Sequence, residues 1–387
     1  MSEALLAQQS WPTVSDRPDA LPARMQAVGF DRFGDPDVLT LREVDTPDLG
    51  PGQVAIRVAA VSVGRLLDVS ARAGTHPYAH IALPHVPGAE HAGTVAAVAA
   101  DVTTLRVGDH VAVLPVLTCG ECAACAAGAT EACATARILG LHVPGAYAEY
   151  TVVPAGNAFV VPEGVGPEQA AALALAGPVA QNQFDEAGLA PGEWVLVHGA
   201  SSALGSLTAA LALHRGARVI ATSRSQDKRV RLEALGAAAV LDPLAPDFAD
   251  RVREATGGAG VDLVVDDLGH PDIWNATMEV LAVRGRVVTS GAFLGGRVEL
   301  DLLRLYSRSQ RIVGVRSGNA RSARRLWAAV AEGFRPLLDR SYPVTAAAEA
   351  HRHLEDSANT GRVVLTTADE DWAGDRAATP NTGEAHS

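Results

Sequence analysis

Four cysteines lie within a stretch of fifteen residues and are the residues of this chain best suited to hold a metal ion. Their spacing is C-x2-C-x2-C-x7-C, formed by Cys119, Cys122, Cys125 and Cys133. A disulfide framework joins distant segments, whereas thiolates clustered in this way converge on one ion. Because four thiolates suit a closed tetrahedral site, we expect one structural Zn²⁺ per chain. The alternatives are a cluster of unreactive thiols and an iron–sulfur cluster.

A second set of candidate residues forms a turn of small side chains between an apolar strand and a helix, from His198 to Gly205. Small residues let the backbone approach a pyrophosphate closely, and the free N–H groups and positive dipole end of the following helix attract the anion. Only two glycines of the G-x-G-x-x-G pattern are kept, so an ordinary strand–helix turn is the alternative. We expect the turn to bind a dinucleotide through Gly199, Ala200, Ser201, Ser202 and Gly205.

The end of the second strand, some 20 residues further on, predicts which dinucleotide binds. An NAD site carries an acid there that accepts a hydrogen bond from the ribose 2′-hydroxyl. This chain has Ser223 and Arg224 at that point, followed by Lys228, its only lysine. A carboxylate would repel a 2′-phosphate, whereas a hydroxyl, a guanidinium and an ammonium bind one. The sequence therefore predicts NADPH, with ordinary surface charges at a helix start as the alternative.

The elements that must position these residues fall into two groups. Strand patterns separated by Gly and Pro turns occupy residues 25–155, for example at 54–63, 93–98 and 110–114. From about residue 190, strands alternate with helices of about ten residues. Such alternation predicts a parallel sheet covered by helices on both faces. We therefore expect an α/β protein with a β-rich first domain and a doubly wound second domain.

Composition and charge exclude several classes of protein. The chain of 387 residues is 48% hydrophobic, which is ample for a buried core. It carries 32 Lys and Arg against 44 Asp and Glu, so we expect no nucleic-acid partner. No apolar run reaches the ~18–20 residues of a membrane span, and the N-terminus lacks the layout of a secretory signal. We expect a cytoplasmic protein without a membrane partner.

Together these parts resemble the medium-chain dehydrogenase/reductase superfamily over about residues 25–366. Besides the cysteines and the Gly199–Gly205 turn, the resemblance rests on Gly93-Thr94-Val95, Val107-Gly108-Asp109-His110-Val111, Gly145-Ala146-Tyr147-Ala148-Glu149-Tyr150, Ala176-Gly177 and Thr360-Gly361-Arg362-Val363-Val364-Leu365. It implies a GroES-like catalytic domain (25–157 and 308–366, with a zinc lobe at 115–137) and a Rossmann NADP-binding domain (158–307). We expect residues 1–24 to be a flexible extension and residues 367–387 to be a disordered acidic tail.

The resemblance also implies a catalytic zinc in one branch of the superfamily, with ligands near residues 64, 89 and 175. This chain reads Val63-Gly64-Arg65, Gly88-Ala89-Glu90 and Leu173-Ala174-Leu175 at those places. Without the metal, the usual Lewis acid for a carbonyl is missing. Hydride addition to a conjugated enone or quinone stays feasible, because charge spreads into an enolate or hydroquinone anion that hydrogen bonds can stabilise. We predict NADPH-dependent reduction of such a small molecule, as in the quinone oxidoreductase and enoyl reductase members.

Candidates for the chemistry itself are fewer. Tyr78 lies in a histidine-rich stretch and is our candidate proton donor, with a rim aromatic packed on prolines as the alternative. The histidines of that stretch, with Glu90, are an alternative metal site. Phe293 is expected to line the nicotinamide pocket, or else the core. Arg65 and Asp68 are interpreted as an ion pair at the mouth of the cleft or as surface charges.

Two other functions remain open. One is a carbonyl reductase or alcohol dehydrogenase that polarises its substrate without metal. The other is a dinucleotide-binding sensor or scaffold with no turnover. The resemblance also implies a homodimer formed by sheet extension in the Rossmann domain, an expectation from fold analogy alone.

Overall fold

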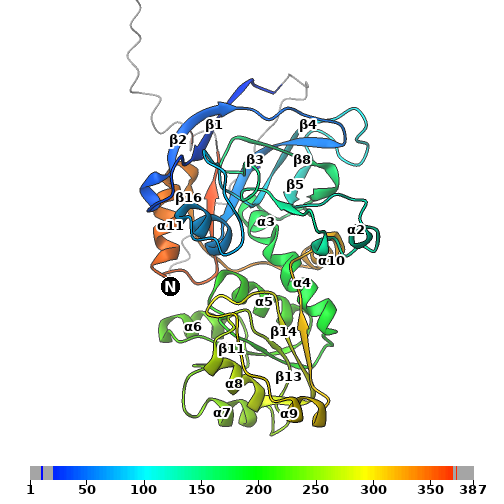
Figure 1. The fold of residues 1–387 in the computed structure, drawn as a ribbon, viewed down its shortest axis with the longest axis vertical. Helices are drawn as coiled ribbons and strands as arrows, with labels where there is room; N and C mark the ends of the chain where they lie inside the picture. Colours follow the sequence, from blue (N-terminus) through cyan, green and yellow to red (C-terminus); the bar gives the residue numbers. More distant parts are fainter. Residues whose placement is uncertain (1–9, 12–20, 369–371, 373–387) are drawn as a thin grey trace, which may run out of the picture.

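Two large sheets divide the chain into an N-terminal and a middle domain, one above the other in Figure 1. This computed structural model describes residues 10–11, 21–368 and 372. The first sheet has seven strands in the order β16-β17-β3-β4-β5-β9, with β8 paired to β3. The second has six strands in the order β12-β11-β10-β13-β14-β15. The domain of the first sheet is called the catalytic domain below, and that of the second the Rossmann domain.

The catalytic domain is closed by the returning C-terminal segment. Its sheet is made of β3 (Gln53–Val63), β4 (Glu90–Val98), β5 (His110–Val113), β8 (Tyr150–Pro154), β9 (Ala158–Val160), β16 (Leu338–Pro343) and β17 (Arg362–Thr366). A separate hairpin pairs β1 (Arg24–Gly29) with β2 (Thr40–Asp45). The strands are rich in Val and Ala, which fit the buried faces of a sheet. β17 pairs antiparallel with β3 across about 300 residues of sequence, so the C-terminal return belongs to this domain.

Short helices cover the catalytic sheet. α3 (Pro167–Leu173) contacts β3 and β4, and α11 (Ala347–Glu355) contacts β17 and β16. A π-helical turn, η2 (Arg65–Val69), follows β3 and runs into α1 (Ser70–Ala73). α10 (Ala320–Ala331) packs against the first helix of the Rossmann domain. Within the described ranges, no helix has the length and apolar character that a membrane crossing requires.

The Rossmann sheet is entirely parallel, as the alternating pattern predicts. Its strands are β10 (Trp194–Val197), β11 (Arg218–Thr222), β12 (Ala239–Leu241), β13 (Val261–Val265), β14 (Leu281–Thr289) and β15 (Arg311–Gly314). Its helices are α4 (Ala176–Ala187), α5 (Ala203–His214), α6 (Gln226–Ala234), α7 (Phe248–Ala255), α8 (Pro271–Val280) and α9 (Leu302–Ser307). Strand order reverses on either side of β10, and ligands of doubly wound sheets bind in the crevice at such a switch point. The predicted α/β class is confirmed.

Strand pairing and helix packing place both ends of the Rossmann domain at residues other than the predicted ones. β9 pairs with β5 and α3 packs on β3, so residues 158–175 lie in the catalytic domain. β15 pairs with β14, so residues 311–314 complete the Rossmann sheet rather than the catalytic domain. The predicted Rossmann range of 158–307 is therefore displaced to 176–314. The reason is physical: these short strands are assigned by the neighbours they bond to, which composition does not reveal.

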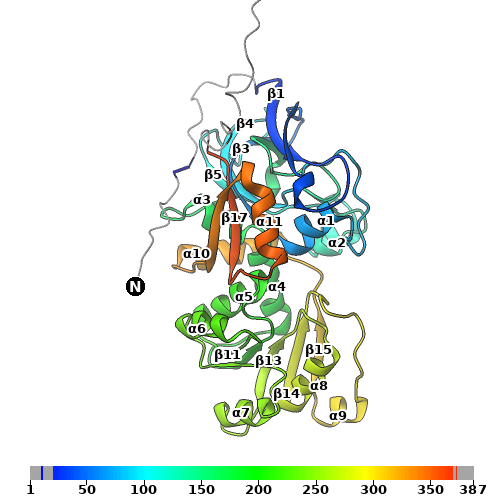
Figure 2. The ribbon, with the colours of Figure 1, turned by 90° about the vertical axis from the view of Figure 1, so that its left-hand side faces the viewer.

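The core is continuous between the domains. One buried cluster contains Ala60 and Val364 of the catalytic sheet together with Leu207 and Leu211 of α5. α4 contacts both α5 and α10 inside this cluster. Figure 2 shows β17 and α11 ending directly above α5 and α6, so the loop that joins them borders the Rossmann domain.

Two tryptophans of the predicted terminal extensions pack on the catalytic domain. The Trp11 ring stacks on His110, with centroids 4.5 Å apart, and its Nε1 donates to the Val165 carbonyl at 3.3 Å. Trp372 is buried in the cluster that contains Met25 and Val28. The described parts of both extensions are thus anchored by an aromatic side chain, and the other residues predicted to be flexible, 1–9, 12–20, 369–371 and 373–387, lie outside the described residues.

Candidate coenzyme and metal sites

The four cysteine thiols converge, as predicted. They lie on a lobe whose base is the antiparallel pair β6 (Val116–Leu117) and β7 (Arg137–Ile138), with α2 (Ala123–Ala126) between them. All four Sγ atoms lie within 4.8 Å of one another. Cys119 Sγ is 3.9 Å from Cys125 Sγ and 3.6 Å from Cys133 Sγ. A tetrahedral zinc with bonds of about 2.3 Å would place sulfurs about 3.8 Å apart, so the donor set fits zinc.

Backbone N–H groups prepare two of these thiols for the thiolate form. Hydrogen bonds from the N–H groups of Glu121 and Cys122 lower the pKa of Cys119. Backbone hydrogen bonding lowers the pKa of Cys133 to about 6. Loss of solvent raises the pKa of Cys125 to about 11. A metal ion must displace the proton of Cys125 on binding, so metal affinity falls as the pH falls.

The lobe is tied to the junction between the domains. Asn319, the N-cap of α10, donates from Nδ2 to Glu131 Oε2 of the lobe at 2.9 Å. Arg316 Nη1 donates to the carbonyl oxygen of Cys133 at 3.4 Å. The carbonyl of Ser317, the residue after Arg316, accepts a hydrogen bond from Asn182 Nδ2 of α4 at 2.7 Å. The lobe therefore supports the segment where the chain leaves the Rossmann sheet for α10.

The turn between β10 and α5 has the shape that a pyrophosphate requires. Gly199 has φ +60°, a left-handed backbone that favours glycine. A Cβ on Gly205 would lie 2.3 Å from the Gly199 carbonyl oxygen, so only glycine allows this close approach. Ser202 caps α5 by accepting from the Gly205 N–H at 3.1 Å. The turn therefore presents backbone N–H groups at a helix start, as an anion site does.

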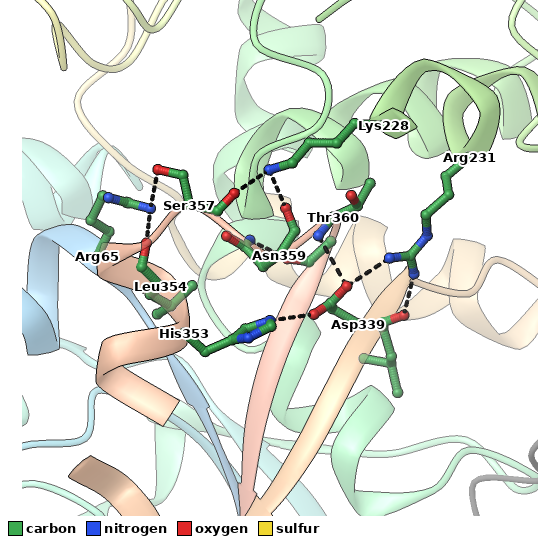
Figure 3. Close-up of polar contacts among 11 residues, drawn as sticks. Arg65, Lys228, Arg231, Asp339, His353, Leu354, Ser357, Asn359 and Thr360 are labelled. Atoms are coloured by element: carbon green, nitrogen blue, oxygen red, sulfur yellow. Dashed lines mark hydrogen bonds and ion pairs between the residues drawn. The ribbon is translucent and has the colours of Figure 1, made fainter. Parts of the chain in front are cut away.

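The end of β11 lies against this turn. Thr222 Oγ1 accepts from the Gly199 N–H at 3.1 Å, and Ser223 Oγ donates to Ser201 Oγ at 3.2 Å. Arg224 is exposed just beyond. Lys228 of α6 is close in sequence, but its ammonium donates to the Ser357 and Asn359 carbonyls at 2.6 and 2.7 Å (Figure 3). Ser223 thus lies beside the turn with Arg224 next to it in sequence, whereas the ammonium of Lys228 contacts the catalytic domain.

The three segments that would carry a catalytic zinc do meet in space, around Glu90. The Ala176 N–H donates to Glu90 Oε2 at 3.1 Å. A Cβ on Gly64 would lie 3.8 Å from Glu90 Oε1 and 3.3 Å from Asp68 Oδ2. Arg362 Nη2 pairs with Glu90 Oε1 at 2.5 Å, and both side chains are buried. Charged side chains are therefore present around this place. Gly64, Ala89 and Leu175, however, have no side-chain atom that could bind a metal ion.

A catalytic zinc therefore does not fit this place. Over residues 21–368, the cysteine lobe is the only group of three or more His, Cys, Asp or Glu donors close enough to hold an ion. The histidine-rich stretch forms no such group, which contradicts the alternative of a histidine metal site. His85 bonds the Gly140 carbonyl at 2.9 Å, and His91 bonds Thr151 Oγ1 at 3.0 Å. Burial lowers the pKa of His91 to about 4, so it stays neutral.

Asp68 and Arg65 are not the surface pair that the sequence suggested. Asp68 is buried and accepts from the N–H groups of Gly64 at 2.6 Å and Gly88 at 2.9 Å. Burial raises its pKa to about 7; Glu90 acts in the same direction, and Arg362 opposes it. Arg65 instead bonds the Leu354 carbonyl and, at 3.3 Å, Ser357 Oγ (Figure 3). Neither role carries a sequence signal, because the partners are distant in the chain or belong to the backbone.

The two aromatic candidates are both exposed. Tyr78 is 71% exposed, and its ring stands edge-on to His76 with centroids 4.6 Å apart. Exposure removes the alternative of a packed rim aromatic and leaves its hydroxyl accessible. Phe293 is 57% exposed, and the Arg65 guanidinium lies 5.9 Å from its ring centroid. Phe293 is therefore not a core residue, and its contact with Arg65 links the two domains.

Comparison with known proteins agrees with this architecture. Residues 50–163 match the family described as alcohol dehydrogenase GroES-like domain, and residues 203–332 match the zinc-binding dehydrogenases. An NAD-dependent alcohol dehydrogenase of Sulfolobus acidocaldarius is 30% identical over 348 residues, which are 88% of this chain and 99% of that protein.

Solved structures give the same result. A crystal structure of an NAD-dependent alcohol dehydrogenase superposes with a TM-score of 0.81 at 36% identity, covering 89% of this chain and 100% of that one. A mycobacterial quinone oxidoreductase superposes with a TM-score of 0.72 at 31% identity, with coverage of 89% and 100%. The joined GroES-like and Rossmann domains and these matches together make the chain an oxidoreductase of the medium-chain dehydrogenase/reductase superfamily.

Proposed function

We propose that this protein is an NADPH-dependent reductase of activated C=C bonds or quinones that works without a catalytic metal. The observation that carries the proposal is the place around Glu90. Three segments converge there, yet Gly64, Ala89 and Leu175 offer no metal ligand, and Glu90 is paired with Arg362. A substrate whose charge is delocalised on reduction does not need a Lewis acid beside it.

The coenzyme part of the proposal rests on the β10–α5 turn and the end of β11. Nicotinamide, when bound, supplies the reducing equivalent. Backbone groups of the Gly199–Gly205 turn would hold the pyrophosphate, and Ala200, which is buried, keeps the turn close-packed. Ser223 and Arg224 offer a hydroxyl and a free guanidinium to a 2′-phosphate, and no carboxylate follows β11 directly. This supports NADPH, although two of the relatives named above are described as NAD-dependent.

The cysteine lobe is proposed to hold one zinc ion per chain in a structural role. Its four thiols form a closed donor set, and it supports α10 through Glu131 and Cys133. For the substrate side, Tyr78 is proposed to donate a hydrogen bond or proton to the substrate oxygen, because its hydroxyl is accessible. Phe293 is proposed to flank the nicotinamide.

A carbonyl reductase or alcohol dehydrogenase is the second candidate, favoured by the names of the relatives. Initial rates with NADPH and NADH separate the two, using a cyclic enone, a benzoquinone and the matched saturated ketone. Activity with the enone or quinone and none with the ketone supports the first proposal, and the reverse result overturns it. Tight NADPH binding with no turnover of any acceptor would instead favour a sensor or scaffold. Tyr78→Phe is expected to lower kcat about tenfold with little change in the KM for NADPH.

We also propose a homodimer, in the cytoplasm. β15 is an edge strand of the Rossmann sheet, and Leu302, Leu303 and Tyr306 of the adjacent α9 are more than 60% exposed. Unpaired edge strands and large apolar patches are features that association covers. Light scattering of the purified chain is expected to give twice the mass of 40.0 kDa, and Tyr306→Asp should shift it toward the monomer.

A further inference from the structure

The ammonium of Lys228 joins the Rossmann domain to one loop of the catalytic domain. This loop, residues 357–361 between α11 and β17, is called the return loop here. Lys228 Nζ donates to the Ser357 carbonyl at 2.6 Å and to the Asn359 carbonyl at 2.7 Å. Figure 3 shows the lysine extending from α6 across the gap between the domains to these two oxygens. The contact links residues about 130 positions apart, so it is a tertiary contact between domains.

The same loop is held at two further points. Arg231, one turn along α6, pairs with Asp339 at 2.7 Å, and Asp339 accepts from the Thr360 N–H at 3.0 Å (Figure 3). The Gly361 N–H points to the Ser201 carbonyl at 3.4 Å, which places the return loop on the pyrophosphate turn itself. The loop therefore borders the part of the crevice where the adenosine half of a dinucleotide would lie.

Charge around Lys228 is not balanced by these contacts. Its two acceptors are neutral carbonyls. The carboxylate that acts on it, Asp339, is already shared by Arg231 at 2.7 Å and His353 at 2.8 Å, and Glu355 acts on Arg65. Burial lowers the pKa of Lys228, Asp339 opposes this, and the nearby Arg65 and Arg231 lower the pKa further. The group is thus a cation beside two other cations, and an added anion would stabilise it.

The contacts of the ammonium leave one of its donors for that anion. A lysine side chain has three N–H donors, and two of them bond the return loop. Arg224 and Ser223 lie at the end of β11, four and five residues before Lys228. A phosphate bound to Ser223 and Arg224 would take the third N–H of Lys228. Neither carbonyl has to be given up.

We propose that Lys228 binds the coenzyme 2′-phosphate and the return loop at the same time, so that it both selects the phosphorylated coenzyme and couples its binding to docking of the two domains. The proposal rests on the NADPH preference stated above. A phosphate dianion neutralises the excess charge and strengthens the ammonium–carbonyl bonds, whereas the 2′-hydroxyl of NAD does neither. Because coupling is reciprocal, a loosened return loop must weaken binding of the phosphorylated coenzyme by the same factor.

Hydrogen exchange of the full-length, metal-loaded protein tests this, with 2′,5′-ADP and 5′-AMP as probes that differ only in the 2′-phosphate. Saturating 2′,5′-ADP is expected to slow exchange of the return-loop amides about tenfold, and 5′-AMP to leave it within twofold. Lys228→Met should abolish this response and weaken 2′,5′-ADP about tenfold, while 5′-AMP binding changes little. Lys228→Arg should restore part of both.

Two control variants separate the two roles. Arg224→Met should weaken 2′,5′-ADP but keep the loop response at saturation. Arg231→Met should speed loop exchange without ligand, weaken 2′,5′-ADP by a similar factor, and keep the loop response at saturation. Preferential binding of 2′,5′-ADP with no loop response, or a response that survives in Lys228→Met, overturns this inference and leaves the proposed NADPH preference standing. Equal affinity for the two probes overturns both.

Discussion

The cysteine lobe and the place around Glu90 are two regions of one domain that have opposite relations to metal. In the lobe, four ligands come from one segment of fifteen residues, and their sulfurs already lie at zinc-binding distances. Around Glu90, the three expected ligand positions are spread over about 110 residues of chain. They are occupied by Gly64, Ala89 and Leu175. What is kept there is the outer set of charges, Asp68, Glu90 and Arg362. These charges form a buried ion-pair cluster of their own.

The comparison indicates that Asp68, Glu90 and Arg362 can stay buried without a metal ion, because each has its own hydrogen-bond or ion-pair partner. Glu90 is paired with Arg362, and its other oxygen accepts the Ala176 N–H. Asp68 has two backbone donors. The lobe has no such internal balance, since four thiolates repel one another until a cation is present. The two regions should therefore respond differently to substitution.

The largest effect is expected in the lobe. Cys133→Ser removes the one buried ligand, and zinc content should fall from one ion per chain to nearly none. Loss of a structural metal should lower the free energy of unfolding by about 4 kcal/mol or more. Elemental analysis and urea denaturation measure both. Ala126→Ser, on the same lobe, is the control and should change neither; a Cys133→Ser protein that keeps its metal would contradict the assignment.

The next effect is expected at the ion pair. Glu90→Gln leaves the buried Arg362 guanidinium without its carboxylate, which should cost about 3–5 kcal/mol of unfolding free energy. Zinc content should stay at one per chain, because the lobe is untouched. Adding Arg362→Met should recover part of the loss in denaturation experiments. A loss below about 1 kcal/mol would show that the pair behaves like an exposed salt bridge.

A smaller effect concerns Asp68 and pH. The pKa of Asp68, about 7 in the fold, lies above its unfolded value, so this group stabilises the fold below the unfolded pKa and loses that contribution as the pH rises through 7. Charged or titratable groups that face it are Glu90, Arg362 and Tyr147. The buried histidines His91 and His198 act oppositely, since burial lowers their pKa values to about 4.

Asp68→Asn should therefore lose stability more steeply than the unchanged protein as the pH falls from 7 to 5. The difference should be about 1 kcal/mol per pH unit, close to the value for one proton. Urea denaturation at several pH values measures the slope. Parallel slopes for the two proteins would mean that Asp68 is ionised in the fold throughout this range.

The smallest effect is expected for Gly64→Cys. Gly64 has an extended backbone with φ −106°, and a Cβ there meets nothing closer than 3.3 Å, so the change should cost less than about 1 kcal/mol. One thiol with Asp68 and Glu90 is not expected to bind a second zinc, because Arg362 already holds Glu90. Two metal ions per chain in this variant would contradict the conclusion that the place around Glu90 does not bind zinc.

Local features of the fold could be predicted from the sequence, and long-range pairings could not. The strands predicted at 54–63 and 110–114 occur at Gln53–Val63 and His110–Val113, because apolar runs bounded by Gly and Pro leave little choice. β15 is a four-residue edge strand ending in Gly314, and nothing in its composition distinguishes it from a loop. The sequence pattern therefore places residues 311–314 in the catalytic domain, whereas pairing with β14 places them in the Rossmann sheet.

The candidate site divides in the same way. The four cysteines and the turn residues Gly199 and Gly205 are local in sequence, so spacing alone predicts their role. Asp68 was taken for a surface charge because its burial is produced by Gly64 and Gly88 folding around it. The contact of Lys228 with the return loop depends on how two domains dock, and the amino-acid sequence by itself carries no signal of that.

That contact has a practical consequence, because Lys228 is the only lysine of the chain. Reagents that acylate amines can modify just two kinds of group here, the α-amino terminus and this side chain. Desolvation lowers the pKa of Lys228, which increases the share of nucleophilic amine near neutral pH. The rate at which an acyl group appears on α6 therefore reports how often the Lys228 ammonium leaves the two return-loop carbonyls.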